Sequence, residues 1–127
     1  MATWAEAKAA VLEISTFNGK EVNDKLIAGV VNLENGRTQQ VFVGGVADKL
    51  VLMSIVCKLE QVNLNGLFTA EAFQQLPYGL SAVSDNLVFK HSTLLETLDM
   101  KEIVTPLVEM ALAADALELG VTGSDAY

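Results

Sequence analysis

The sequence predicts an α+β domain, in which an antiparallel sheet of about five strands is combined with an N-terminal helix, a short crossover helix and a long C-terminal helix. Apolar residues recur at helical spacing near both ends of the chain. Between these ends, short apolar segments are bounded by glycine, asparagine and aspartate, as in strands joined by tight turns. The 127 residues have the length of one domain. We expect residues 1–119 to form this domain and residues 120–127, which are small and polar, to form a flexible tail.

The first helix is predicted directly at the N-terminus. Thr3 and Glu6 have the spacing of a capping box, in which two side chains satisfy backbone amides at the start of a helix. An apolar stripe with spacings of three and four residues follows, and we expect the helix to end near Phe17. The stripe consists of Trp4, Ala7, Val11 and Ile14.

Two hairpins and one long strand account for the predicted sheet. Asn35-Gly36 separates LIAGVVNL from RTQQVFVGG, and Asp85-Asn86 separates GLSAVS from LVFKHSTLL. Both dipeptides tolerate the positive φ of a tight hairpin loop. The apolar run KLVLMSIVCKL is typical of a central strand that is covered on both faces.

Two further segments have less regular patterns. Residues 60–77 are interpreted as an irregular crossover with a short helix that Thr69 caps and Pro77 ends. The strand RTQQVFV combines polar side chains with apolar ones. It either reaches a sheet edge, where a partner strand could pair with it, or presents a polar face to water.

The C-terminal third predicts a strand that leads through a capping signal into a long helix. Asp99 and Glu102 form a second capping box. Pro106 removes a helical hydrogen bond, so either the helix kinks there or Thr105 caps a new helix that begins at Pro106. Gly120 is the expected end of this helix. The apolar stripe consists of Ile103, Leu107, Met110, Ala114 and Leu117.

Charge and composition argue against several function classes. The net charge is −8, and residues 91–127 hold seven acidic groups against Lys101 alone, so no basic patch for nucleic acid is expected. The apolar runs are far shorter than a bilayer-spanning helix, and the N-terminus lacks the features of a secretory signal. We therefore expect a cytoplasmic protein with no membrane partner. Cys57, the single cysteine, is expected to be a buried thiol.

No catalytic, cofactor-binding or metal-binding site is predicted. His91 is the only histidine, and no local motif supplies a nucleophile or a carboxylate to work with it. Gly44-Gly45 precedes a strand, not a phosphate-binding helix. One alternative stays open, a small-molecule sensor or enzyme subunit with a pocket between sheet and helix in which His91 or Tyr78 is the polar anchor.

The order of elements and three segments resemble the class I type III secretion chaperones and the related YbjN family of small bacterial proteins. The segments are RTQQVFVGG, the strand ending in SIVCKL, and LVFKHSTLLETLDMKEIVTPLVEMALAADALEL. The resemblance spans most of the chain, and the sequence departs from the family pattern at Pro106. It implies a small, acidic, mostly dimeric and non-enzymatic protein. The secretion chaperones of this group hold an extended segment of a partner across their sheets.

We therefore expect a non-catalytic protein-binding domain, chaperone-like or adaptor in character, that acts as a homodimer. The final helix is the leading candidate for the dimer contact, because its apolar residues occupy more than the one side that a sheet can cover. The residues expected to contact a partner or a second copy are Val41, Phe42, Val43, Ile103, Val104, Leu107, Val108, Met110 and Leu112.

Overall fold

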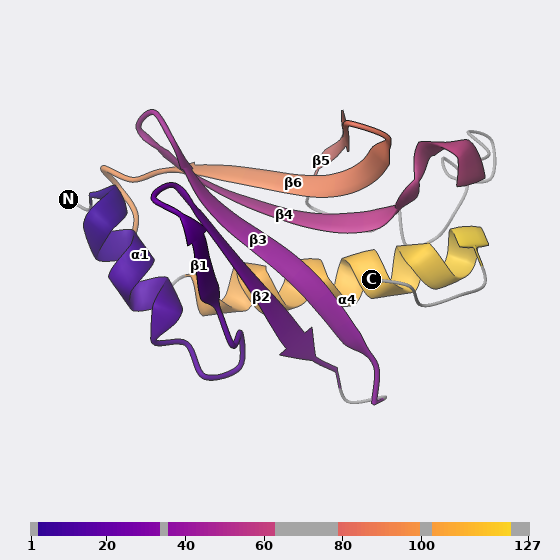
Figure 1. Ribbon diagram of the computed structural model, residues 1–127, viewed down its shortest axis with the longest axis horizontal. Helices are drawn as coiled ribbons and strands as arrows, with labels where there is room; N and C mark the ends of the chain where they lie inside the picture. Colours follow the sequence, from indigo (N-terminus) through magenta and orange to yellow (C-terminus); the bar gives the residue numbers. More distant parts are fainter. Residues whose placement is uncertain (1–2, 34–35, 63–78, 100–102, 123–127) are drawn as a thin grey trace.

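The computed structural model describes residues 3–33, 36–62, 79–99 and 103–122. These residues form an α+β domain, as the sequence predicts (Figure 1). Its elements are α1 (Trp4–Leu12), β1 (Lys20–Asn23), β2 (Leu26–Asn32), β3 (Thr38–Val46), β4 (Lys49–Lys58), the 3₁₀ turn η1 (Leu59–Gln61), β5 (Gly79–Val83), β6 (Asn86–Leu94) and α4 (Val104–Thr122). The predicted crossover helix and Tyr78 lie outside the described residues.

The strands form one antiparallel sheet in the order β1-β2-β3-β4-β6-β5. Both predicted hairpins are present, as β2–β3 and β5–β6. The second turns at Ser84-Asp85 instead of Asp85-Asn86: Asn86 is the first residue of β6, and the positive φ of 53° is at Ser84. The strand that the sequence did not predict is β1, whose four residues are all exposed and give no apolar alternation. The edge position considered for RTQQVFV is correct for one part of this segment and wrong for the other. Strand β3 pairs with β2 from Thr38 to Gly44, but with β4 only from Phe42 to Val46, so residues 38–41 have no ladder partner in β4.

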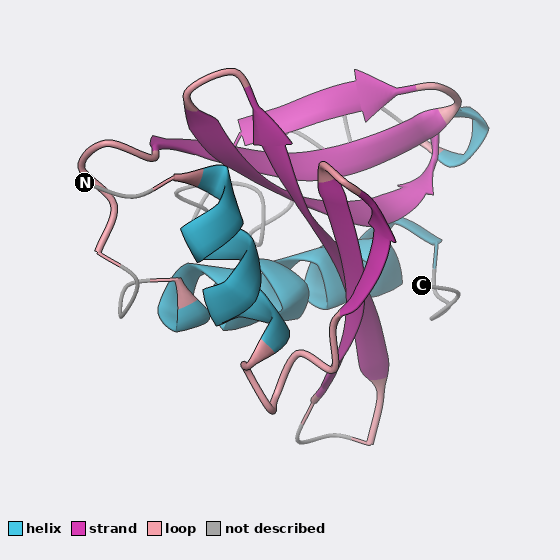
Figure 2. Ribbon diagram, turned by 60° about the vertical axis from the view of Figure 1, so that its left-hand side comes forward, coloured by secondary structure: helices cyan, strands magenta, loops and turns pink. Residues whose placement is uncertain are grey.

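The described residues form two layers, with α1 and α4 on one face of the sheet (Figure 2). Helix α1 lies over the β1–β3 side, where the Trp4 ring covers Gly45; a Cβ at that glycine would come within 2.5 Å of the ring. Helix α4 packs on β3, β4 and β6. We call the opposite side of the sheet the open face, because no α-helix of the described residues covers it.

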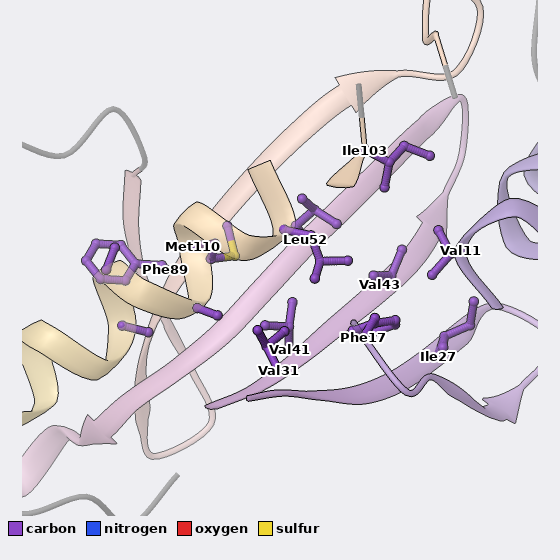
Figure 3. Close-up of a cluster of buried hydrophobic side chains, with 14 of the residues drawn as sticks. Val11, Phe17, Ile27, Val31, Val41, Val43, Leu52, Phe89, Ile103 and Met110 are labelled. Atoms are coloured by element: carbon purple, nitrogen blue, oxygen red, sulfur yellow. The ribbon is translucent and has the colours of Figure 1, made fainter. Parts of the chain in front are cut away.

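The core fills the space between the helices and the sheet (Figure 3). Val11 from α1 and Met110 from α4 meet side chains from the inner face of the strands, such as Val43 and Leu52. The expected cover on both faces of β4 is only partial. Its inner side chains are buried, whereas Met53 and Ile55 on the open face are half-buried.

The N-terminal helix begins where the capping signal predicts. The hydroxyl of Thr3 accepts a hydrogen bond from the amide of Glu6 at 3.2 Å. The helix ends at Leu12 instead of near Phe17. Phe17 lies in the following turn and is fully buried against β2, because Gly29 has no side chain and leaves room for the ring. Of the predicted stripe, Ala7 and Val11 are buried in the helix as expected, whereas Ile14 lies beyond its end.

The long helix begins at Val104, and the amide of Leu107 donates to the carbonyl of Ile103 at 3.2 Å. Pro106 is therefore in the first turn, where its missing amide costs no hydrogen bond within the helix. Thr105 is a helical residue and not the cap. Asp99 precedes the helix by five positions and cannot cap it, and residues 100–102 lie outside the described part of the chain.

The C-terminal end of this helix also differs from the prediction. Helix α4 continues through Gly120 and ends at Thr122. A Cβ at Gly120 would meet no atom within 4 Å, so no packing contact requires a glycine there. A glycine inside a helix costs only about 1 kcal/mol relative to alanine, and the helix tolerates it.

Candidate functional site

Helix α4 has an unusual distribution of polar residues. Among its exposed and half-buried positions from Val104 to Val121, Glu109 is the only charged residue. Asp115 and Glu118 are buried, with at most 2% of their surface exposed. Val104 and Leu112 are 39% and 48% exposed. A surface helix normally has the opposite arrangement, with apolar residues inside and charges outside.

The buried carboxylate of Asp115 is held by Arg37. Nε of Arg37 donates to both carboxylate oxygens at 3.0 Å, and one terminal nitrogen donates to Oδ2 at 2.7 Å. Arg37 directly precedes β3, so the pair fastens the β2–β3 hairpin to α4. Charge-assisted contacts of this forked kind are among the stronger hydrogen bonds in proteins. The sequence analysis missed this pair, because 78 positions separate its members.

A second buried polar group joins β3 to β4 where their pairing ends. The ladder between the two strands stops at Phe42–Met53, beyond which β3 diverges from β4 (Figure 1). Here the side-chain nitrogen Nε2 of Gln39 donates to the Ser54 hydroxyl at 2.9 Å and to the Ile55 carbonyl at 2.8 Å. The Ser54 hydroxyl donates to the Gln40 carbonyl at 2.7 Å. These bonds replace the missing ladder beneath α4.

Cys57 is buried, as the sequence predicts. Burial raises the pKa of its thiol, and the nearby negative charge of Glu118 raises this pKa further. A raised pKa lowers the fraction of the reactive thiolate at neutral pH. The structure therefore gives Cys57 a packing role.

The structure separates the predicted contact residues into two groups. One group lies in the core with at most 2% of each residue exposed and packs against its own chain: Val41, Val43, Ile103, Leu107 and Met110. The other group reaches the surface and consists of Phe42 on the open face and Val104, Val108 and Leu112 on α4. The surface that a partner can contact on α4 is thus the outer side of the predicted stripe.

His91 lies on the wall of a small pocket between β6 and the start of α4. The pocket has a volume of about 140 Å³, and its wall is apolar apart from His91 and Thr93. Small-molecule sites usually have volumes of about 300–1,000 Å³. The pocket has room for a single small apolar group. The structure thus gives little support to a sensor or enzyme site here.

Neither a metal cluster nor a membrane-spanning helix is found among the described residues. In that part of the chain, no three histidine, cysteine or acidic side chains come together as metal ligands would. None of its helices combines the length and apolar character that a bilayer crossing requires.

Neither the protein-family models nor the curated proteins contain a match to this sequence. Solved structures do match. The chain superposes on one from the crystal structure of the ExsC–ExsE complex with a TM-score of 0.65 and 10% identity, covering 98% of this chain and 100% of that one. A chain of the heterodimeric ExoU–SpcU complex, from the type III secretion system of Pseudomonas aeruginosa, matches with a TM-score of 0.55 and 10% identity, over 83% and 89% of the two chains.

The first match extends over nearly the whole chain and the second over more than four fifths of it. At 10% identity they establish the architecture and not a shared partner. The sheet with α1 and α4 on one face therefore has the fold of the type III secretion chaperones, as the resemblance in the sequence implies.

Proposed function

We propose that this chain is a non-catalytic protein-binding domain that acts as a homodimer and holds a segment of a protein partner in the manner of a secretion chaperone. The observation that carries the proposal is the outer side of α4, where Val104, Val108 and Leu112 reach the surface and Glu109 is the only charge. Contiguous apolar surface of this kind is typical of sites that bind another protein.

The spacing along α4 supports contact with a second copy of the same helix. The outer residues Val104, Val108, Leu112, Ala116 and Gly120 follow one another at intervals of four positions. Ridges with this interval interlock when two helices cross at about −50°, the commonest angle in globular proteins. The small residues at the C-terminal end allow the two backbones to approach. An isologous dimer, in which each copy offers the same surface, satisfies both helices at once.

The similar structures support the protein-binding part of the proposal. Both of the matches described above come from complexes of two proteins. This chain also offers an uncharged edge strand, β5, with the sequence GLSAV. An extended partner can pair with such an edge through backbone hydrogen bonds. The opposite edge, β1, has charged Lys20 and Glu21, and charged residues discourage strand pairing. The cytoplasmic location and the relation to the YbjN family stay predictions.

The partner can be identified by isolating the tagged chain from its source cells and digesting the isolated complex with a protease. We expect one protein in a fixed ratio to the chain, with a short segment protected from digestion. Hydrogen exchange should show slower exchange in that segment and in β5 on binding. A chain that is isolated alone, and is a monomer at micromolar concentration, would contradict the proposal.

A further inference from the structure

The open face of the sheet combines apolar side chains with lysines. Residues that are directly paired in an antiparallel sheet share a face. The register Ala28–Phe42–Met53–Lys90 therefore forms one row across four strands, and Leu26–Gly44–Val51–Ser92 forms the next row. Lys20 pairs with Ala28 and extends the first row onto β1. Lys49 pairs with Val46 and Leu94 in a third row.

Acidic residues are missing from the strand positions of this face. Among the described strands, the one carboxylate is Glu21, which belongs to the helix-covered face and pairs with Lys8 of α1 at 2.6 Å. The acids next to Lys25 and Lys49 in the sequence are Asp24 and Asp48, both in turns, and Asp48 pairs with Lys49 at 3.1 Å. In a chain of net charge −8, a face with lysines and no carboxylate on its strands is a marked local reversal of sign.

A shallow groove crosses this face. Its volume is about 410 Å³, and its floor is formed by Leu26, Gly44, Val51 and Met53. Lys25, Lys49 and Lys90 line it as well. Among the described residues, no carboxylate forms an ion pair with the side chain of Lys25 or Lys90. The groove thus offers an apolar surface bordered by positive charge.

We propose that this groove binds an extended segment of a protein partner in which apolar side chains alternate or mix with aspartate and glutamate. The inference rests on the proposed protein-binding function and specifies the chemistry of the partner. Apolar side chains would cover the floor, and carboxylates would pair with the surrounding lysines. A second copy of the same face is a poor occupant, because it would bring lysine against lysine.

The size of the groove sets the length of the bound segment. The groove runs from β2 to β6 through β3 and β4, and neighbouring strands lie about 4.8 Å apart. The distance across is about 14 Å, which an extended chain covers with about four to five residues. A short acidic and apolar segment is therefore enough to place one carboxylate near Lys25 and another near Lys90.

Labelled decapeptides test the proposal by fluorescence anisotropy. One peptide mixes leucine and valine with glutamate, and two others have glutamine or lysine in place of every glutamate. We expect the glutamate peptide to bind about tenfold more tightly than the lysine peptide at low salt, and this ratio to shrink at about 1 M salt, where charges are screened beyond about 3 Å. Equal binding of the three peptides would overturn the proposal.

Variants of the protein locate the binding. In the double variant Lys25→Glu, Lys90→Glu the preference should reverse in favour of the lysine peptide. Lys58→Glu makes a matched change at an exposed lysine outside the groove lining and should leave the preference unchanged. An unchanged preference in the double variant, with an unchanged circular dichroism spectrum, would overturn the proposal. So would a single-stranded oligonucleotide that binds as tightly as the glutamate peptide.

The inference and the proposed function can fail separately. The groove is lined by open-face residues such as Met53 and Lys90, and α4 lies on the other face of the sheet (Figure 2). Dimer contact through α4 therefore leaves the groove accessible. A dimer that holds a partner but shows no preference for the glutamate peptide contradicts only the inference. A monomer without a protein partner contradicts the proposed function itself.

Discussion

Arg37 and Asp115 form a salt bridge between the β2–β3 hairpin and α4. Asp115 is 2% exposed and lies on α4, whereas Arg37 is partly exposed at the start of β3. If its partner is removed, a buried carboxylate is still desolvated but no longer gains the attraction of the positive charge. The pair thus links the hairpin to the helix, and it explains how α4 can carry an acid on its inner side.

Replacing Arg37 by methionine should lower the free energy of unfolding by about 1–3 kcal/mol, because Asp115 is left buried and unpaired. Urea unfolding followed by circular dichroism measures the change. The control is Lys49→Met, which removes an ion pair whose two side chains are both well exposed and should cost less than about 1 kcal/mol. If Arg37→Met costs no more than this control, the pair does not have the structural role assigned to it.

The Cys57 thiol should react slowly with a disulfide reagent in the folded protein at about pH 8, near the pKa of a free thiol. Its pKa is raised by burial and by Glu118, so at a given pH less thiolate is present than for an exposed cysteine. Reaction should become fast and complete in concentrated urea. Equal rates in the folded and unfolded protein would show that the side chain is accessible, against its buried position.

At the scale of elements, the packing of β2 includes the ring of Phe17, which lies outside the sheet. Phe17 is fully buried beside Gly29, and its carbonyl accepts a hydrogen bond from the amide of Val30 at 2.8 Å. The residue after it, Asn18, has a positive φ of 53°, which asparagine tolerates better than most residues. The turn therefore places Phe17 over the strand where a glycine leaves space.

Replacing Gly29 by alanine should lower the free energy of unfolding by about 1–3 kcal/mol, because the new Cβ would overlap the Phe17 ring. Gly79→Ala is the matched control on β5. A Cβ there has its nearest contact at 3.9 Å from the Lys90 carbonyl oxygen, so the change should stay within about 0.5 kcal/mol. Thermal or urea unfolding of both variants makes the comparison. Similar stability of the two would contradict the packing described for Phe17.

The elements that the sequence predicts correctly are those set by residues close together in the chain. The cap at Thr3, the β2–β3 and β5–β6 hairpins and the central strand β4 follow from local spacing and turn residues, and all are observed. Strand β1 is fully exposed, so it shows no alternation to detect. The start of α4 was misplaced because a proline in the first turn and one in the middle of a helix look alike in a sequence.

Contacts that join distant parts of the chain could not be predicted in the same way. The sequence shows that α4 has apolar residues on several sides, but not which side faces the sheet. In the fold, Asp115 lies on the inner side and pairs with Arg37, whereas Val108 and Leu112 reach the surface. The lysines of the open face also come together only in the folded sheet, since they are on β1, β4, β6 and a turn.

On the scale of the whole molecule, the two sides of the sheet present different surfaces. On the helix side, the outer side of α4 is apolar. On the open face, an apolar groove is bordered by lysines. A dimer through α4 would place two grooves on the outside of the assembly, each available to a partner segment. The secretion chaperone fold, shown by the similar structures, provides the framework for this arrangement.

The mass of the protein in solution tests the dimer most directly. Light scattering coupled to size exclusion should give the wild-type chain, at micromolar concentration, about twice its monomer mass of 13.6 kDa. Leu112→Glu places a charge on the outer side of α4 and should give the monomer mass. The control Leu12→Glu adds the same charge at a leucine of α1 that is 37% exposed, and this variant should stay dimeric. A monomeric wild-type chain, or a Leu112→Glu variant that remains dimeric, would contradict the account.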